Sequence, residues 1–441
     1  MFSNKDLRSL IFPLVIEQVL SMLVGIIDTV MISYAGEAAI SGVALVDMVN
    51  NLVITVMAAL ATGGAVIVSQ YLGSRDREKA NFAAGQLIAI AALISTVLMV
   101  LCLLLHRAVL QLLFGQVEPD VMEAAVTYFI ISALSFPFLG IYNSSAALFR
   151  SMRKTNVTMY VSLLMNILNI IGNSIGIFVL HAGVAGVAWP TMISRMIAAV
   201  LLTALAFRKD YEVTLTRRAI FAADGAMIKR ILRIAIPNGI ENGLFMLGKV
   251  LVTSIVSMFG TVQIAANGVS NSVNMIAIIV VNAVNLAMVT VVGQCVGAGE
   301  YGQAVHYTKK LMAVSYIATG ILSLLVFLAM PLILRFYSLT EETRALSILL
   351  INLHNALAFA LHPTSFNLSN SLRAAGDVRF TMAAGIASMI VFRLGSAYLF
   401  GIVLNLGVIG VWIAMGTDWL FRSVLFVIRF RSGKWKEIRS I

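Results

Sequence analysis

The sequence contains an internal repeat, so that its two halves resemble each other. Identical residues recur 224 positions apart, and no gap is needed over the first stretch of each half. The matched pairs include Pro13 and Pro237, Glu17 and Glu241, Gly36 and Gly260, and Gly73 and Gly297. Further along, the shift becomes 223, where RSMRKTNVTM (150–159) falls on RAAGDVRFTM (373–382). Whatever fold the first half adopts, the second half is therefore expected to adopt a similar one.

The composition shows what kind of solvent the two halves need. Hydrophobic residues make up 60% of the 441 residues and charged residues only 12%, about half the charge of a soluble domain. The apolar runs are continuous rather than alternating and long enough to cross a lipid bilayer as helices, which favours helices over a β-barrel. Twelve runs are predicted: 9–34, 42–71, 84–106, 121–149, 157–180, 184–207, 231–258, 266–296, 306–332, 341–371, 380–404 and 406–430.

The basic residues behind the net charge of +11 are unevenly placed along the sequence. Lysine and arginine gather at the amino terminus, in every second loop, and at the carboxyl terminus between Arg429 and Arg439. The intervening loops carry no comparable excess, so the positive-inside rule places both termini in the cytoplasm and requires an even number of spans. We expect a multi-pass protein of the inner (plasma) membrane and no nucleic-acid partner.

Two similar six-helix halves predict the domain organisation. We expect a lobe at 1–207, a polar cytoplasmic linker at 208–230 and a second lobe at 231–441. The fold class predicted is an all-α integral membrane protein of twelve transmembrane helices, in two pseudo-symmetric six-helix lobes with a central cavity. The first apolar run is too long for a cleaved signal peptide. Cys102 and Cys295 both lie in predicted spans, where a structural disulfide is not expected.

The chain carries no enzymatic constellation. There is no glycine-rich phosphate loop, so the chain has no ATP site of its own. His354 and His362 could share a helix face, but they have no nearby carboxylate or cysteine to complete a metal site. We therefore predict a protein that is not an enzyme and holds no cofactor. Internal repetition in so apolar a chain is typical of transporters, and an ion gradient or a partner would supply the energy.

Four polar residues within predicted spans are candidates for a coupling site. Asp28 lies in the middle of the first span, and a carboxylate at membrane depth is a functional hypothesis by default. Asn169 and Asn173 are four residues apart and share a helix face, where their amide oxygens could serve a cation or a protonated carboxyl. Thr191 follows Pro190. The alternatives are an interfacial acid, interhelical hydrogen bonding and an ordinary helix threonine.

Comparison of the two halves shows that these four polar residues have no counterparts in the second half. Asp28 falls on Val252, Asn169 on Phe392 or Arg393, Asn173 on Ser396 or Ala397, and Thr191 on Ala414 or Met415. Residues kept in both halves plausibly serve the common fold, whereas these four are unique to the first half. A monovalent cation or a proton at Asp28 is the expected occupant, and no other metal is predicted.

Several segments resemble one known family, the multidrug and toxic compound extrusion (MATE) transporters. IIDTVMISYAGEAAISGVAL (26–45) is similar to the family's first-helix signature, and LRAAGDVRFTM (372–382) to its loop between the fourth and fifth helices of a half. NIIGN (169–173) and GVAGVAWPT (183–191) look like its fifth and sixth helices. The resemblance implies a sodium- or proton-driven exporter of organic, often cationic, compounds, with an ion-binding cluster at Asp28, Asn169, Asn173 and Thr191.

The second half departs from the family's sodium-coupled branch. Glu241 stands about one turn earlier than that branch's glutamate, and His362 occupies roughly the place of its aspartate. Glu241 has a twin in Glu17, which favours a structural or gating role for both. Lys249 and Arg393 are mid-span cations that could pair with Asp418, snorkel or line the cavity.

The prediction from sequence is an antiporter with alternating access. It would act as a monomer in membrane lipid on small organic compounds, chiefly cationic ones, with a proton or sodium as the coupling ion. The alternative is a flippase for lipid intermediates on a related scaffold, in which Lys249 and Arg393 would meet a phosphate. A non-transporting membrane protein is a third reading, but no soluble effector domain supports it.

Overall fold

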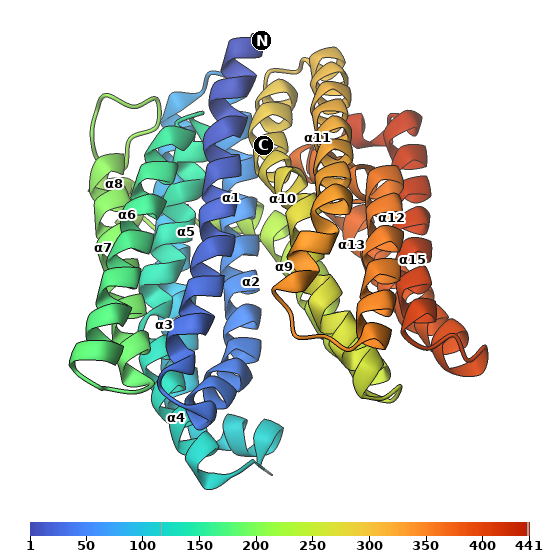
Figure 1. Cartoon of the computed structure of the whole chain (residues 1–441). Coiled ribbons are helices and arrows are strands. Elements are labelled where there is room, and N and C mark those ends of the chain that lie inside the picture. The colour runs from blue at the N-terminus through green and yellow to red at the C-terminus, as the bar shows by residue number, and fades with distance from the viewer. Residues whose placement is uncertain (116, 439–440) are drawn as a thin grey trace. The chain divides into compact units, whose positions relative to one another are not determined.

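Long helices make up almost all of the structure, a computed structural model that describes residues 1–115, 117–438 and 441 (Figure 1). Arg439, at the end of the basic carboxyl terminus, lies outside them. The first helices are α1 (Asn4–Ser33), α2 (Glu37–Gly73), α3 (Arg77–Phe114), α4 (Pro119–Leu134), α5 (Phe136–Ser151), α6 (Thr155–Ser174), η1 (Ile175–Val179), α7 (Ala185–Ala206) and α8 (Arg217–Phe221). They are followed by α9 (Gly225–Ser257), α10 (Thr261–Gly297), α11 (Tyr301–Arg335), α12 (Glu341–Ala374), α13 (Val378–Ala387), η2 (Ser388–Gly395), α14 (Ser396–Tyr398), η3 (Leu399–Val403), α15 (Gly407–Ser432) and η4 (Lys434–Glu437).

Twelve membrane spans can be built from these helices. Among the described residues, eleven helices are long and apolar enough to cross a membrane, and the bent pair α4–α5 supplies the twelfth. Each of the twelve predicted runs lies within or along one of these spans. The all-α fold with six spans in each half is therefore confirmed.

The chain forms two compact units that divide inside α9, between Gly239 and Ile240. The segment 208–230, expected to be a linker, contains α8 and packs on α3 in the first unit. The Gln86 side-chain amide donates to the carbonyls of Ala219 at 2.6 Å and Ala222 at 2.7 Å. Gly85 fits against the Ala219 backbone, where a Cβ would lie 2.5 Å from the carbonyl carbon.

The fourth span is broken rather than continuous, contrary to the single run predicted over 121–149. α4 ends at Leu134, α5 begins at Phe136, and the two axes differ by 46°. Pro137 explains the break, because proline has no N–H and its ring clashes with the carbonyl of the preceding turn. At the break, the Ser132 carbonyl accepts from both the Ser135 N–H at 3.0 Å and the Ser135 hydroxyl at 2.7 Å.

The duplication is visible in the backbone. Gly36 and Gly260, which precede the second span of each half, have φ of +106° and +95°. Gly183 and Gly407, which precede the sixth span, both have φ of +57°. These left-handed conformations favour glycine because it has no Cβ. The two halves therefore turn at the same places with the same residue type.

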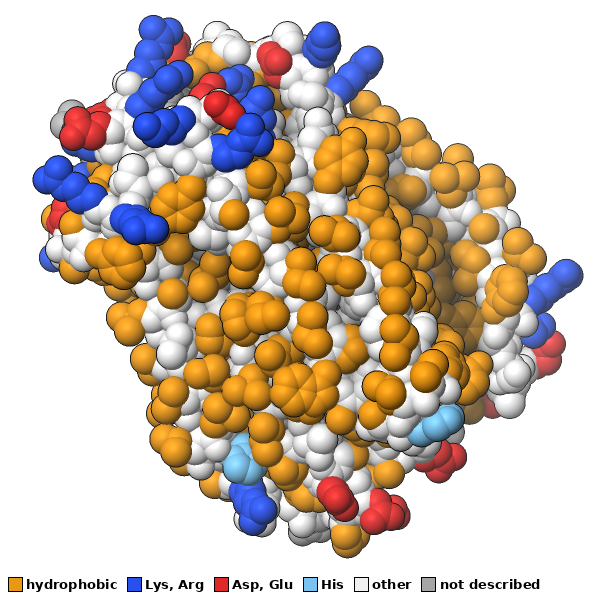
Figure 2. All heavy atoms as spheres, turned by 90° about the vertical axis from the view of Figure 1, so that its left-hand side faces the viewer, with side chains coloured by type: hydrophobic (Ala, Val, Ile, Leu, Met, Phe, Trp, Pro, Cys, Tyr) orange, Lys and Arg blue, Asp and Glu red, His pale blue; other side chains and the backbone are white. Residues whose placement is uncertain are grey.

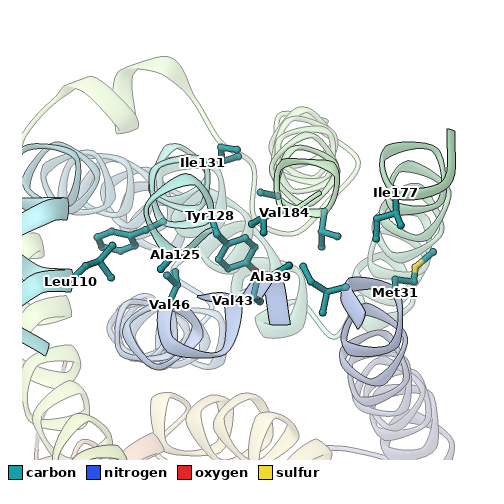
Figure 3. Packing of buried hydrophobic residues seen from close by; sticks show 14 residues of the cluster. Met31, Ala39, Val43, Val46, Leu110, Ala125, Tyr128, Ile131, Ile177 and Val184 are labelled. Carbon is teal, nitrogen blue, oxygen red and sulfur yellow. The ribbon is translucent and has the colours of Figure 1, made fainter. Parts of the chain in front are cut away.

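The core of the first unit is an apolar cluster shared by α1, α2, α3, α4, η1 and α7 (Figure 3). Met31 and Ile177 come from α1 and η1, Val43 and Val46 from α2, and Tyr128 from α4. On the face shown in Figure 2, hydrophobic side chains cover the middle, while most of the lysine and arginine side chains gather at one end. An apolar exterior of this kind suits a protein solvated by lipid.

Close helix packing gives the first stability prediction. A Cβ on Gly176 would lie 2.1 Å from the carbonyl oxygen of Gly186, which is backbone and cannot move aside. Gly176→Ala should therefore destabilise the protein by about 3 kcal/mol through overpacking. The control is Gly268→Ala in α10, where a Cβ meets nothing within 4 Å. Thermal unfolding of the two variants in detergent checks this, and equal melting temperatures would contradict it.

Candidate functional site

A chain of hydrogen bonds joins the four polar residues singled out in the first half. Asn173 Nδ2 donates to Asp28 Oδ1 at 2.8 Å and to Asn169 Oδ1 at 3.0 Å. Asn169 Nδ2 in turn donates to Thr191 Oγ1 at 2.9 Å. The Thr191 hydroxyl donates to the Val187 carbonyl at 3.0 Å. The structure thus connects α1, α6 and α7 through one polar chain.

Small residues allow α6 and α7 to come close enough for these bonds. A Cβ on Gly172 would lie 2.6 Å from the Pro190 ring. Gly172 lies between Asn169 and Asn173, and Pro190 directly precedes Thr191. Glycine at this contact therefore sets the spacing between the asparagine pair and the threonine.

The polar chain is largely removed from solvent. Asn173 has 0% and Asn169 5% of its surface exposed, and Asp28 is half-buried. The Asn173 side-chain oxygen is buried and makes no hydrogen bond. A buried amide oxygen without a donor is costly, and a cation or a protonated carboxyl would satisfy it. Oxygen atoms of this kind suit a hard monovalent cation or a proton.

Sequence reasoning missed a second set of charged residues in the same unit. Asp47 on α2 accepts a hydrogen bond from Asn50 Nδ2 at 3.4 Å, and its charge interacts with those of Asp28 and Arg195. Arg195 lies one turn beyond Thr191 on α7, and its Nη1 donates to Ser135 Oγ at 2.8 Å. The signal was available, because both are ionisable residues inside predicted spans, as Asp28 is.

The twin glutamates Glu17 and Glu241 form equivalent ion pairs in the two units. Glu17 Oε1 lies 2.5 Å from Arg150 Nη2, and Glu241 Oε2 lies 2.6 Å from Arg373 Nη2. Arg150 and Arg373 are themselves partners in the repeat. Glu17 also accepts a hydrogen bond from the Thr158 hydroxyl at 3.1 Å. A gating role for either glutamate stays a prediction.

The remaining predicted residues lie in the second unit. His362 on α12 is buried, stacks on Phe366 at 4.3 Å between ring centroids and packs edge-on against Trp419 at 4.9 Å. Arg393 lies on η2, with its Nη1 3.7 Å from Asp418 Oδ2. Lys249 lies over the Phe245 ring at 5.1 Å. None of these joins the polar chain of the first unit.

No cluster of three or more histidine, cysteine or acidic side chains with metal-binding geometry occurs among the described residues. The polar chain has one carboxylate, two amides and one hydroxyl, and these ligands do not form a transition-metal site. That a monovalent cation or a proton binds there stays a prediction.

The comparisons with known proteins now bear on this geometry. A family model described as MatE matches residues 13–175 and again 237–399, one match in each half of the chain. The chain belongs to the MatE family. The matched residues include Asp28, Asn169 and Asn173 in the first half and Glu241 in the second.

Relatives of this MatE protein match nearly its full length. It is 30% identical to "Uncharacterized transporter YisQ" of Bacillus subtilis, with 98% of this chain and 94% of the relative covered. It is 26% identical to "Probable multidrug resistance protein NorM" of Thermotoga maritima, covering 98% and 93%. A solved structure titled "Outward-facing conformation of a multidrug resistance MATE family transporter of the MOP superfamily" shares the fold, with a TM-score of 0.91 at 20% identity, covering 98% and 97%.

These findings establish the class of protein. This MatE protein is a multi-pass membrane transporter, and its family acts on small molecules. Relatives named as multidrug-resistance proteins do not favour the lipid flippase considered from the sequence.

Proposed function

We propose that this MatE protein is an antiporter that exports organic compounds, chiefly cationic ones, across the inner (plasma) membrane by alternating access. A proton or a sodium ion at Asp28 would drive the exchange. The protein would work as a monomer, without a cofactor, and with both termini in the cytoplasm. The observation that carries the proposal is the hydrogen-bonded chain from Asp28 to Thr191.

The chain of contacts suits ion coupling for a physical reason. With Asp28 ionised, Asn173 donates to the carboxylate, while its own oxygen is left buried without a partner. A cation bound there would neutralise the carboxylate and satisfy the amide oxygen. Binding of the cation would therefore change the forces between α1, α6 and α7, the three helices that the polar chain connects. Coupling requires that ion and substrate differ in affinity between two states of the protein.

The repeat supports a coupling role over a scaffold role. Val252 occupies the position equivalent to Asp28, so the second unit folds in the same way without this carboxylate. A residue needed only for the shared fold would have a counterpart in both halves.

Vesicle transport with separate gradients tests the proposal. Purified protein in proteoliposomes receives a fluorescent cationic dye under a pH gradient without sodium, or under a sodium gradient at uniform pH. We expect dye movement above that of empty liposomes under one of the two gradients. Dye movement that is equal with and without both gradients would contradict an antiport mechanism.

A further inference from the structure

One face of α9 carries a carboxylate, an aromatic ring and an ammonium at successive turns. Glu241, Phe245 and Lys249 are spaced by four residues, so they lie along one side of the helix over about 12 Å. Leu247 and Leu251 are exposed apolar residues on the opposite side. Glu241 is buried and Phe245 packs on Phe366 in the same unit, whereas Lys249, at the other end of the stripe, is exposed.

The Glu241 end of this stripe is neutralised. Arg373 lies 2.6 Å and Arg422 3.7 Å from the Glu241 carboxylate. Arg422 Nε also donates to Asp418 Oδ1 at 3.0 Å, and Ser388 donates to the same oxygen. Two carboxylates and two guanidinium groups thus balance in charge at this end.

The other end is cationic. The Lys249 side chain is exposed, and in the described part of the chain no carboxylate lies within 4.0 Å of its ammonium. Arg393 approaches Asp418 only to 3.7 Å, while its Nε and Nη1 are buried without a hydrogen-bond partner. The two cations are close enough to repel each other. Contact between Gly248 and Met389, where a Cβ would lie 2.4 Å from the sulfur, places α9 directly against η2.

The charges of this region do not balance. Glu241 and Asp418 face three cations, namely Arg373, Arg422 and Arg393, and Lys249 adds a fourth cation near Arg393. Unpaired charge in a low-dielectric environment is costly, so such cations in a span usually have a counter-ion. A bound anion would supply it.

The repeat also shows that Lys249 and Arg393 are specific to the second half. Lys249 stands where the first half has Gly25, and Arg393 falls on Asn169 or Ile170, depending on whether the shift is 224 or 223. The two cations therefore have no charged counterparts in the first half.

We propose that Lys249 and Arg393 form an anion site that accepts a carboxylate, sulfonate or phosphate of the substrate. Phe245 and Phe366, with ring centroids 6.3 Å apart, provide an adjoining aromatic surface for an apolar body. The substrate class that follows is an amphiphile with an oxyanion group, including zwitterions that also carry a positive charge. This inference rests on the proposed export function for its physiological meaning, but the binding site is tested without transport.

A pair of dyes that differ only in the anionic group isolates the site. Rhodamine 110 has a free carboxylate, and rhodamine 123 is its methyl ester. Equilibrium binding is followed by fluorescence anisotropy in uncharged detergent, with no gradient. We expect wild type to prefer the carboxylate dye by about tenfold, since a charge-assisted hydrogen bond is worth that much. Lys249→Met should reduce the preference to about one.

Matched variants make the outcome specific. Lys249→Arg should keep the preference, Arg393→Gln should weaken it, and Lys309→Met, at an exposed position on α11, should leave it unchanged. Lys249→Met protein that elutes as wild type in gel filtration and still prefers the carboxylate dye would overturn the proposal. A wild type without any preference would overturn it equally.

Two further experiments are added. The first tells whether the oxyanion belongs to a lipid headgroup or to a soluble compound, and the second tests the anion site apart from the export proposal. Phosphatidylglycerol that displaces the carboxylate dye from wild type, but not from Lys249→Met, would assign the oxyanion to a lipid headgroup. Failure to displace it would assign the oxyanion to a soluble compound. Asp28→Asn should lose coupled transport yet keep the dye preference. The export proposal can therefore fail while the anion site is supported, and the anion site can fail while export is supported.

Discussion

Asp28→Asn should fold as wild type and lose ion-coupled transport. The substitution keeps the size of the side chain and can keep the hydrogen bond with Asn173, but it removes the only negative charge of the polar chain. Without that charge the site has no group to release and bind the coupling ion. The change in substrate affinity that coupling supplies, roughly 5- to 150-fold in known systems, should then disappear. Dye efflux from proteoliposomes, measured with and without the driving gradient, checks this.

Two controls keep this result specific. Asp120→Asn removes a carboxylate from the exposed first turn of α4, and its efflux should remain at the wild-type rate. Asn166→Ala removes a buried amide from α6 that has no part in the chain of hydrogen bonds. Gradient-dependent efflux by Asp28→Asn at the wild-type rate would exclude Asp28 as the coupling residue.

Glu241→Gln should destabilise the second unit by about 3–5 kcal/mol, the usual cost of leaving a buried ion pair without one partner. The Glu241 and Arg373 side chains are only 3% and 8% exposed, and Arg422 lies nearby at 4%. Removing the carboxylate leaves two guanidinium groups facing each other across a water-poor contact. Thermal unfolding in detergent should show a large fall in melting temperature relative to wild type.

A double variant identifies the cause of the loss. Glu241→Gln combined with Arg373→Met removes the stranded cation as well, and should recover part of the lost stability. The matched single change in the other half is Glu17→Gln, where the pair is more exposed and contains one arginine. We expect a smaller loss there. A double variant no more stable than Glu241→Gln would show that the charge imbalance is not the cause.

The sequence was most informative where a physical signal is local and repeated. Continuous apolar runs located all twelve spans, because a lipid-exposed helix needs about twenty apolar residues in succession. The break at Ser135 was missed because the run around Pro137 stays apolar on both sides. The wide helical turns of η1, η2 and η3 were not anticipated either, since their composition does not differ from that of the flanking helices.

The candidate site was predictable only in part. Charge inside a span pointed to Asp28, and the repeat separated it from Glu17. The same criterion would have found Asp47 and Arg195, had it been applied to every span. Pairing between Glu241 and Arg373 could not be read from the sequence, because the partners lie on α9 and α12 and nothing local joins them. Their equivalence to Glu17 and Arg150 was the one clue.

The bend between α4 and α5 has a mechanical consequence. Arg195 donates to Ser135 at the apex of the bend, and it lies one turn from Thr191, the last member of the polar chain. A change in the bend angle must displace Arg195 or break its bond, and α7 would transmit the displacement to Thr191. As long as the Arg195–Ser135 bond holds, a change in the angle of the fourth span would thus move α7 at the end of the polar chain.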